Sequence, residues 1–362
     1  MVFVGSVGLG IPEHHVTQEE VKKLVQHIFL SNRKLRKLLP VFDNAKVASR
    51  QLVVDKSWFK KEHTFAEANQ LYFSSAKQLS LQAIDSCLKS ELLTDPIPYD
   101  AIDMIVFVSS TGITTPSLDA YLLNERPFRE DIVRMPLWGL GCAGGAIGLS
   151  RAFEWIRLHP EKVALVVCCE LCSLTFQKND FSTSNLVGTA IFGDGAGATI
   201  LIGERSPFKE QLTKKLRIKN THSFTKKNST TVMGWDVTAN GLEVIFSKRI
   251  PKLVESIWKD HVLNFLKKEQ MDVHHLSAII AHPGGRKVLE EMERTLRIQQ
   301  NLLHHSYTVL KNHGNMSSAT VLYVLKKWFQ NKRDEDFEKK LGILCALGPG
   351  FSSELLLLEW ME

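Results

Sequence analysis

The stretch 137-LWGLGCAGGAIGLSRAFEWI-156 places a single cysteine, Cys142, among glycines, between an apolar segment and an amphipathic one. This pattern predicts an extended segment that ends in a glycine-rich turn and a helix that begins directly after it. The unpaired amides and the positive end of the helix dipole would then face the turn side chain, which can lower the pKa of a thiol. The other interpretation of Cys142 is a small buried residue at a tight turn, because free cysteine is among the most buried residue types.

Length and composition describe an ordinary globular chain. Its 362 residues, 44% hydrophobic and 23% charged, suffice for two domains or one large core. The N-terminal MVFVGSVGLGIPEHH has no basic region before its apolar run, so it predicts a buried first strand rather than a signal peptide. No segment has the roughly 20 continuous apolar residues that a membrane span needs. We therefore expect a cytoplasmic protein without a membrane span.

Cysteine spacing and charge exclude several classes of protein. Cys168, Cys169 and Cys172 crowd one apolar segment and the others are scattered, so no disulfide framework is indicated. The CxxC of Cys169 and Cys172 has no second ligand pair for zinc and does not open a helix, as a redox motif would.

The net charge of the chain is +6. Basic residues cluster at 33–37, 213–219 and 332–340, where they are mixed with acidic residues or spread along helical faces. They favour solvated surface over nucleic-acid binding, and a positive bias suits an anionic coenzyme A thioester.

Strand-like and helix-like segments alternate along the chain. Short, branched, apolar runs predict buried strands at 101–110, 162–170, 195–203, 276–283 and 352–360. Spacing near 3.6 predicts helices at 117–128, 144–160, 251–270 and 317–332. The alternation predicts an α/β fold with largely parallel sheets, buried on both faces.

The two halves of the chain resemble each other loosely. A polar junction at 203–220 predicts a division into residues 1–205 and 206–362. The first half contains GCAGGAIGL and ends on FGDGAGATILIG, and the second contains HGNMSSATVLYVL and ends on ALGPGFSSELLLL. A glycine turn before a helix and another before a strand, each occurring twice, suggest a duplication.

The second half offers polar partners for a thiol. His282 follows a buried-strand pattern and precedes Pro-Gly-Gly, which places it at the strand edge where α/β proteins bind ligands. Asn315 follows Gly314 at a helix start. Taken singly, His282 could merely satisfy a loop and Asn315 could be an N-cap. Together with Cys142 they form the set needed to make a nucleophile and to hold a negative oxygen.

Five motifs then occur in a specific order. They are GCAGG around Cys142, FGDGAGA at 192–198, AHPGG around His282, GNMSSA around Asn315 and GPGF at 348–351. Over nearly the whole chain the protein resembles the chalcone and stilbene synthase family of type III polyketide synthases. Its segments 167–177 and 233–251 look more like bacterial members than plant ones.

The resemblance implies a thiolase-like fold of five layers, αβαβα, with two pseudo-duplicated halves, the first carrying Cys142 and the second His282 and Asn315. It also implies a homodimeric acyltransferase with Cys142 as nucleophile and His282 and Asn315 as its partners. Its substrates would be acyl-CoA and malonyl-CoA, and it would need no metal or organic cofactor.

The resemblance further suggests residues of the substrate pocket. Phe192 matches one of two gatekeeper aromatics, and the other position falls on Val244, where plant members carry Phe. The positions that match the cavity wall are Thr111, Thr115, Cys172, Thr175 and Ser317. Most are small, and valine at the gate leaves room for an alkyl chain. We therefore expect medium- to long-chain fatty acyl-CoA starters and alkyl-α-pyrone products.

Three other functions remain open on the sequence. A β-ketoacyl carrier-protein synthase of the same fold would also use Cys, His and Asn, but its histidine loop usually reads His-Gln-Ala-Asn rather than His-Pro-Gly-Gly. A hydrolase of the Cys-His-Asn type would lack the FGDGA and GPG elements. A non-enzymatic binding module would explain the basic charge but none of the motifs.

Overall fold

The computed structural model describes residues 1–29, 37–331 and 341–361. Most of the basic cluster at 33–37 and the whole of the cluster at 332–340 lie outside these residues. The cluster at 213–219 is described, and within it Arg217 and Lys219 both pair with Glu359. No helix among the described residues is long and apolar enough to cross a membrane.

In the described part of the chain, nine strands form one mixed sheet. Their order is β11 (Leu276–Ala281), β12 (Leu341–Gly348), β13 (Ser352–Trp360), β8 (Leu216–Thr225), β1 (Val2–Gly10), β7 (Asp194–Gly203), β6 (Val163–Leu171), β4 (Met104–Ser109) and β5 (Val133–Trp138). The strands of the two halves meet where Val2–Val4 of β1 pair with Leu216–Ile218 of β8. Two small ribbons are made of β2 (His14–Thr17) with β3 (Ser49–Leu52) and of β9 (Met233–Thr238) with β10 (Gly241–Phe246).

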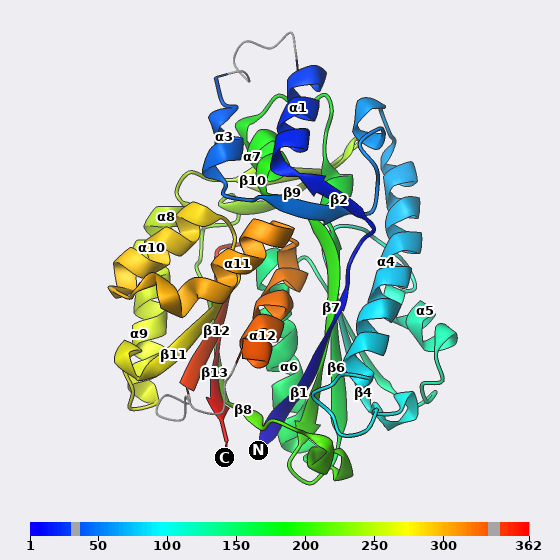
Figure 1. Ribbon diagram of the computed structural model, residues 1–362, viewed down its shortest axis with the longest axis vertical. Helices are drawn as coiled ribbons and strands as arrows, with labels where there is room; N and C mark the ends of the chain where they lie inside the picture. Colours follow the sequence, from blue (N-terminus) through cyan, green and yellow to red (C-terminus); the bar gives the residue numbers. More distant parts are fainter. Residues whose placement is uncertain (30–36, 332–340, 362) are drawn as a thin grey trace.

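Helices lie in three layers around this sheet. They are α1 (Gln18–Ile28), α3 (Pro40–Asn44), α4 (Phe65–Leu88), α5 (Leu118–Glu125), α6 (Gly144–Leu158), α7 (Thr183–Ile191), α8 (Ile250–Leu253), α9 (Lys259–Lys268), α10 (Arg286–Leu296), α11 (His304–His313) and α12 (Thr320–Asn331). Figure 1 shows α6 and α12 between the two parts of the sheet, with α4 and α5 outside β4 and β6 and with α9 and α10 outside β11. The five-layered αβαβα thiolase-like fold is therefore present.

The strand directions differ from the expectation of largely parallel sheets. Only β4 with β5, β4 with β6, and β11 with β12 pair in parallel among the described strands of the main sheet. Strand β13 pairs antiparallel to β12 because the short GPGF turn between them makes a hairpin. The strands predicted at 101–110, 162–170, 195–203, 276–283 and 352–360 are confirmed as β4, β6, β7, β11 and β13.

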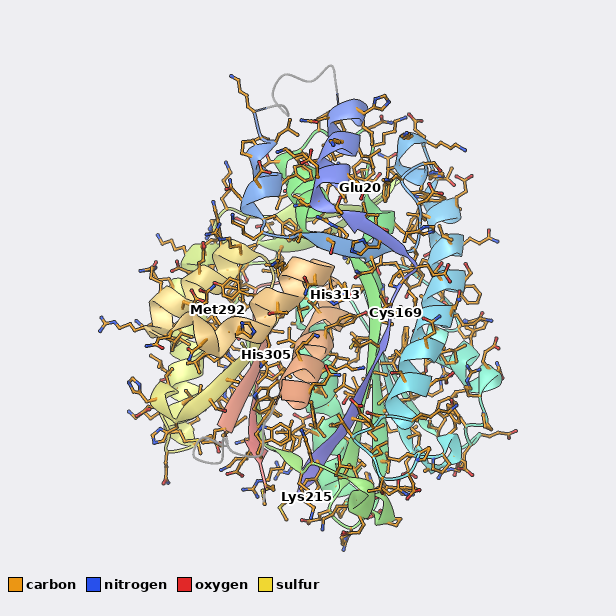
Figure 2. All side chains as sticks on the ribbon, in the orientation of Figure 1. Glu20, Cys169, Lys215, Met292, His305 and His313 are labelled. Carbon is orange, nitrogen blue, oxygen red and sulfur yellow. The ribbon has the colours of Figure 1, made fainter. Side chains whose placement is uncertain are left out.

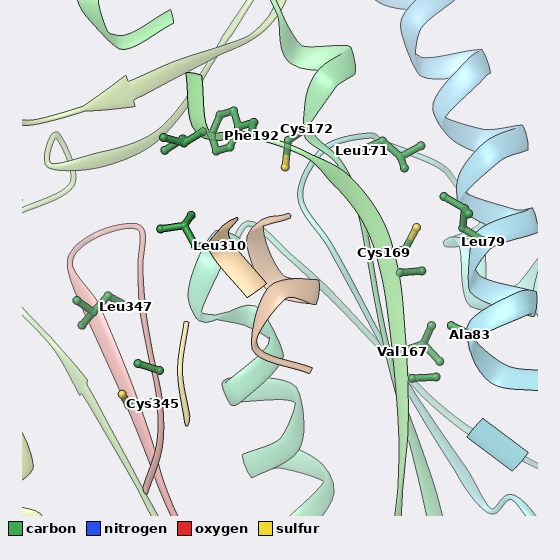
Figure 3. Close-up of a cluster of buried hydrophobic side chains, with 14 of the residues drawn as sticks. Leu79, Ala83, Val167, Cys169, Leu171, Cys172, Phe192, Leu310, Cys345 and Leu347 are labelled. Atoms are coloured by element: carbon green, nitrogen blue, oxygen red, sulfur yellow. The ribbon is translucent and has the colours of Figure 1, made fainter. Parts of the chain in front are cut away.

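The central strands are buried on both faces. Along β6, Val163, Leu165 and Val167 belong to the core against α4, and Ala164 and Val166 belong to the core around α6 and α12. Figure 3 shows Val167 and Cys169 facing Leu79 and Ala83 of α4. Every residue of β6 is buried, which explains its continuous apolar sequence.

The polar junction at 203–220 contains a short 3₁₀ turn, η5 (Pro207–Gln211), and the start of β8. Figure 2 labels Lys215 from this junction at the foot of the molecule, near the chain termini in Figure 1. The division of the chain at 205/206 stays a prediction.

Candidate active site

Cys142 lies at the turn that the sequence predicts. Strand β5 ends at Trp138, the 3₁₀ turn η3 spans Gly141–Ala143, and α6 begins at Gly144. Gly141 has a φ of +48°, which L side chains rarely adopt, so glycine permits this turn. Its amide donates to Ser110 Oγ at 3.1 Å, which ties the turn to the end of β4.

The glycines of three motifs allow three loops to meet at Cys142. A Cβ at Gly348 would lie 2.6 Å from Ala143 Cβ, and one at Gly141 would lie 2.8 Å from Pro349 Cδ. A Cβ at Gly145 would lie 2.3 Å from the backbone oxygen of Ser318. The GCAGG, GPGF and GNMSSA motifs therefore pack directly against one another, at distances that exclude any larger residue.

Asn315 lies between the Cys142 turn and the His282 loop. Its Nδ2 is 3.9 Å from Cys142 Sγ and 3.4 Å from the carbonyl oxygen of Gly284. Its backbone is fixed by a bond from Asn315 N to Ile191 O at 2.7 Å and by one from Gly193 N to Asn315 O at 3.0 Å. Asn315 Oδ1 accepts from Ser317 N at 2.8 Å. The N-cap of the turn that follows, η9 (Ser317–Ala319), is Met316 and it makes no side-chain cap bond, so the interpretation of Asn315 as an N-cap is wrong.

His282 follows β11, as predicted, and is 3% exposed. Its backbone amide donates to Cys345 O at 2.8 Å. Neither ring nitrogen has a hydrogen-bond partner among the described residues. Leaving a buried polar group unpaired costs about 1–3 kcal/mol, and native structures keep few such groups. The ring is therefore free to bond to a bound substrate.

Burial controls the protonation of Cys142 and His282. It raises the pKa of the Cys142 thiol to about 11, although hydrogen bonds from Ser317 and Asn315 act in the opposite direction. Burial also lowers the pKa of His282 to about 3. Burial therefore favours the neutral thiol and the neutral imidazole, and it opposes the lowering of the thiol pKa that we expect from the helix N-terminus and an imidazolium ion.

Glu170 is a buried carboxylate beside the site that our sequence interpretation missed. It is fully buried in β6, and its carboxylate accepts from Ser110 N at 2.9 Å, Thr111 Oγ1 at 2.8 Å and Ser318 Oγ at 2.7 Å. Burial raises the pKa of Glu170. An acidic residue inside the apolar run VVCCELC is a signal that could have identified it.

The predicted gate residues lie together, with additional aromatic rings. Phe192 and Val244 line one pocket. The ring of Phe192 also has Trp235 at 5.9 Å and Phe246 at 5.7 Å between centroids. Both rings come from the ribbon of β9 and β10 that also carries Val244, and our sequence interpretation missed them.

The structure brings together most of the predicted wall residues. Cys172 and Thr175 line the same pocket as the gate, and Thr111 lines a more polar pocket next to it that also includes Thr175. Ser317 acts on the Cys142 thiol, whose pKa it lowers against the effect of burial. Thr115 is exposed and lines neither pocket, so a single chain does not place it at the site.

Comparison with known proteins identifies the family. The model of the chalcone and stilbene synthase N-terminal domain matches residues 2–205, and that of the C-terminal domain matches residues 219–361. The chain belongs to the chalcone and stilbene synthase family. As a type III polyketide synthase it is an acyltransferase, and the alternatives of a carrier-protein synthase, a hydrolase and a binding module are set aside.

Relatives of this polyketide synthase match it from end to end. A Bacillus subtilis (strain 168) protein provisionally named chalcone synthase is 44% identical, covering 99% of each chain. The 1,3,6,8-tetrahydroxynaphthalene synthase of Streptomyces peucetius subsp. caesius is 32% identical, covering 99% of this chain and 93% of its own. The alpha-pyrone synthesis polyketide synthase-like Pks18 of Mycobacterium tuberculosis is 26% identical, covering 99% and 91%.

A solved structure matches the fold of this polyketide synthase closely. It is the 1,3,6,8-tetrahydroxynaphthalene synthase of Streptomyces coelicolor A3(2), described as a bacterial type III polyketide synthase. The TM-score is 0.91 at 27% identity, and the match covers 99% of each chain.

Proposed function

We propose that this protein loads an acyl group from acyl-CoA onto Cys142 and extends it with malonyl-CoA by decarboxylative Claisen condensation. One observation carries the proposal: the Asn315 amide lies 3.9 Å from Cys142 Sγ and also contacts Gly284 of the loop that holds the unpaired ring of His282. The nucleophile and the two proposed hydrogen-bond donors then belong to loops that meet at Asn315. The roles of these residues rest on the family resemblance together with this geometry.

In the loading step His282 acts as general base. Because both groups are neutral, the Cys142 proton passes to the imidazole as Sγ attacks the thioester carbonyl. The coenzyme A thiolate then leaves and takes up a proton. In this scheme the charged pair forms as the thioester is attacked.

In the extension step His282 and Asn315 act as donors. Malonyl-CoA loses CO2, and the resulting enolate oxygen accepts hydrogen bonds from the imidazole N–H and from Asn315 Nδ2. Each donor contributes about 3 kcal/mol in a site that excludes water. The enolate carbon attacks the acyl carbonyl, the bond to Cys142 Sγ breaks, and the lengthened chain is carried by coenzyme A.

We infer that the starter is a medium- to long-chain fatty acyl group and that the main products are alkyl-α-pyrones. The small side chain of Val244 beside Phe192 supports an alkyl substrate, and so does the name of the alpha-pyrone relative. The 1,3,6,8-tetrahydroxynaphthalene synthases among the relatives provide a competing class of product.

Replacing Val244 by phenylalanine should reduce kcat/KM for dodecanoyl-CoA at least tenfold while changing the value for acetyl-CoA little. A ring at this position fills space that several methylenes would otherwise occupy, and each buried methylene is worth about 0.8 kcal/mol. Steady-state assays with both acyl-CoAs and with 4-coumaroyl-CoA measure the effect. Preference of the wild type for the aromatic starter, or an unchanged chain-length preference in V244F, would contradict the gate argument.

We also propose a homodimer that forms through the β5 edge of the sheet. In the described chain this edge has no neighbouring strand, and it exposes Val133 by 43% and Trp138 by 51%, next to Ile113, which is 42% exposed. Thr115 lies in the same loop as Ile113, so a second chain would cover it.

Light scattering on the purified protein should give twice the chain mass, and Val133→Glu should shift the mass toward that of one chain. A charge in the centre of an apolar interface is costly to bury. A single-chain mass for the wild type at micromolar concentration would contradict the proposal.

A further inference from the structure

An apolar pocket lies between helix α1 and the gate. One wall consists of the inner face of α1, with Val21, Leu24, Val25 and Ile28. The opposite wall contains Phe192, Val244 and Cys172. The pocket therefore extends from the gate region to the N-terminal helix, which none of the motifs includes.

Most polar groups of the side chains that line this pocket are hydrogen-bonded within the protein, and the exception among the described residues is Arg50 Nε, which is buried without a partner. Each of these polar side chains makes at least one hydrogen bond to another protein group. They are Arg50, Lys56, Ser173, Thr175, Asn185 and Thr189. Arg50, for example, donates to the carbonyl oxygens of Thr189 and Phe192 and so holds the end of α7. What the pocket offers a ligand is mainly hydrocarbon surface, which fits an alkyl chain better than a polar polyketide.

Two residues that line the pocket lie beside the reacting residues. The backbone of Phe192 pairs with Asn315. The Cys172 thiol, whose pKa is raised by burial and by Glu170 and Asp194, also lies close enough to Cys142 for charge on one sulfur to affect the other. Figure 3 shows the side chain of Cys172 next to that of Phe192. Phe192 and Cys172 therefore link the lining of the pocket to Asn315 and to Cys142.

Helix α1 is held firmly enough to act as a wall. Gln18 Nε2 donates to Ala190 O of α7 at 3.0 Å and to Phe42 O of α3 at 2.9 Å. Thr17 and Glu20 form a capping box at its start, and Lys56 pairs with Glu20 at 2.5 Å. Figure 1 shows α1 above α7 and the ribbon of β9 and β10.

We propose that the alkyl tail of the acyl group on Cys142 lies in this pocket and that the inner face of α1 sets the longest chain the enzyme accepts. The inference rests on the proposed function, because it assumes a fatty acyl thioester on Cys142. Each methylene buried there should change affinity about fourfold, so the preference among acyl chains depends steeply on the length of the pocket.

Crosslinking locates the chain directly. The wild type is incubated without malonyl-CoA with a dodecanoyl-CoA that carries a photoreactive diazirine at its far end, irradiated, digested and analysed by mass spectrometry. The expected crosslinks lie within residues 16–28. Crosslinks in the loop at 112–118 instead, with Cys142 acylated, would overturn the pocket assignment. Failure to acylate Cys142 at all would overturn the proposed function.

Variants test the effect on chain length. Leu24→Trp should lower kcat/KM for dodecanoyl-CoA at least tenfold relative to hexanoyl-CoA, and Leu24→Ala should shift the preference toward longer chains. Gln26→Trp is the matched control, because it adds the same ring to the exposed face of α1. An unchanged chain-length profile in both Leu24 variants would overturn the inference. An altered profile in the Gln26 variant would also overturn it, since the effect would then not come from the pocket.

Discussion

Replacing Cys142 with alanine should abolish polyketide formation, with a loss of about a thousandfold or more, while the fold stays intact. The side chain is small, and its loss removes the atom that carries the acyl group. Decarboxylation of malonyl-CoA alone should persist in C142A, because that step needs donors rather than a thiol. Product yield from acyl-CoA and malonyl-CoA, and release of CO2 from malonyl-CoA, are measured separately.

The matched control for Cys142 is Cys169→Ala. Cys169 is also a free cysteine, more buried than Cys142, and its thiol faces α4 and donates to Ala76 O at 3.7 Å. C169A should keep its product yield. Full yield from C142A would rule out the nucleophile assignment, and equal loss in both variants would indicate a structural effect.

His282 and Asn315 should fail in different steps when they are replaced. His282→Ala should slow acylation of Cys142 about a hundredfold or more at pH 7, because no other base takes the proton of a thiol whose pKa burial raises to about 11. The defect should shrink as pH rises toward that value, since the fraction of thiolate grows about tenfold per pH unit. His282→Ala should also impair decarboxylation.

Asn315→Ala should mainly lose decarboxylation, by about a hundredfold or more, because an amide donates to the enolate but cannot remove a proton. Intact-protein mass spectrometry follows acylation, and CO2 release follows decarboxylation. Normal acylation in H282A together with failed acylation in N315A would require the two roles to be exchanged.

Much of the site could be predicted because its loops are marked by glycines. The close approach of Gly141 to Pro349 and of Gly145 to Ser318 leaves no room for side chains. Glycine is therefore required at these contacts, and the glycines of the motifs indicate where the loops meet. The start of helix α4 could also have been predicted, because Thr64 and Glu67 have the spacing of a capping box, which they form in the structure. Our sequence interpretation did not use it.

Protonation and the rings around the gate could not be predicted in the same way. The pKa of Cys142 depends on how completely distant segments bury it, and no local pattern reports that. Glu170 is bonded by Ser110, Thr111 and Ser318, which come from two separate parts of the chain. Phe246 and Trp235 reach Phe192 only because β9 and β10 fold back over α7.

The most direct test of the account is to follow carbon through the reaction. The wild type is incubated with unlabelled dodecanoyl-CoA and malonyl-CoA labelled with ¹³C at every malonyl carbon, and products and released CO2 are analysed by mass spectrometry. The account predicts a product that contains the whole dodecanoyl chain plus two labelled carbons for each extension, with the third malonyl carbon recovered as labelled CO2. Release of unlabelled dodecanoic acid without any extended product would contradict it.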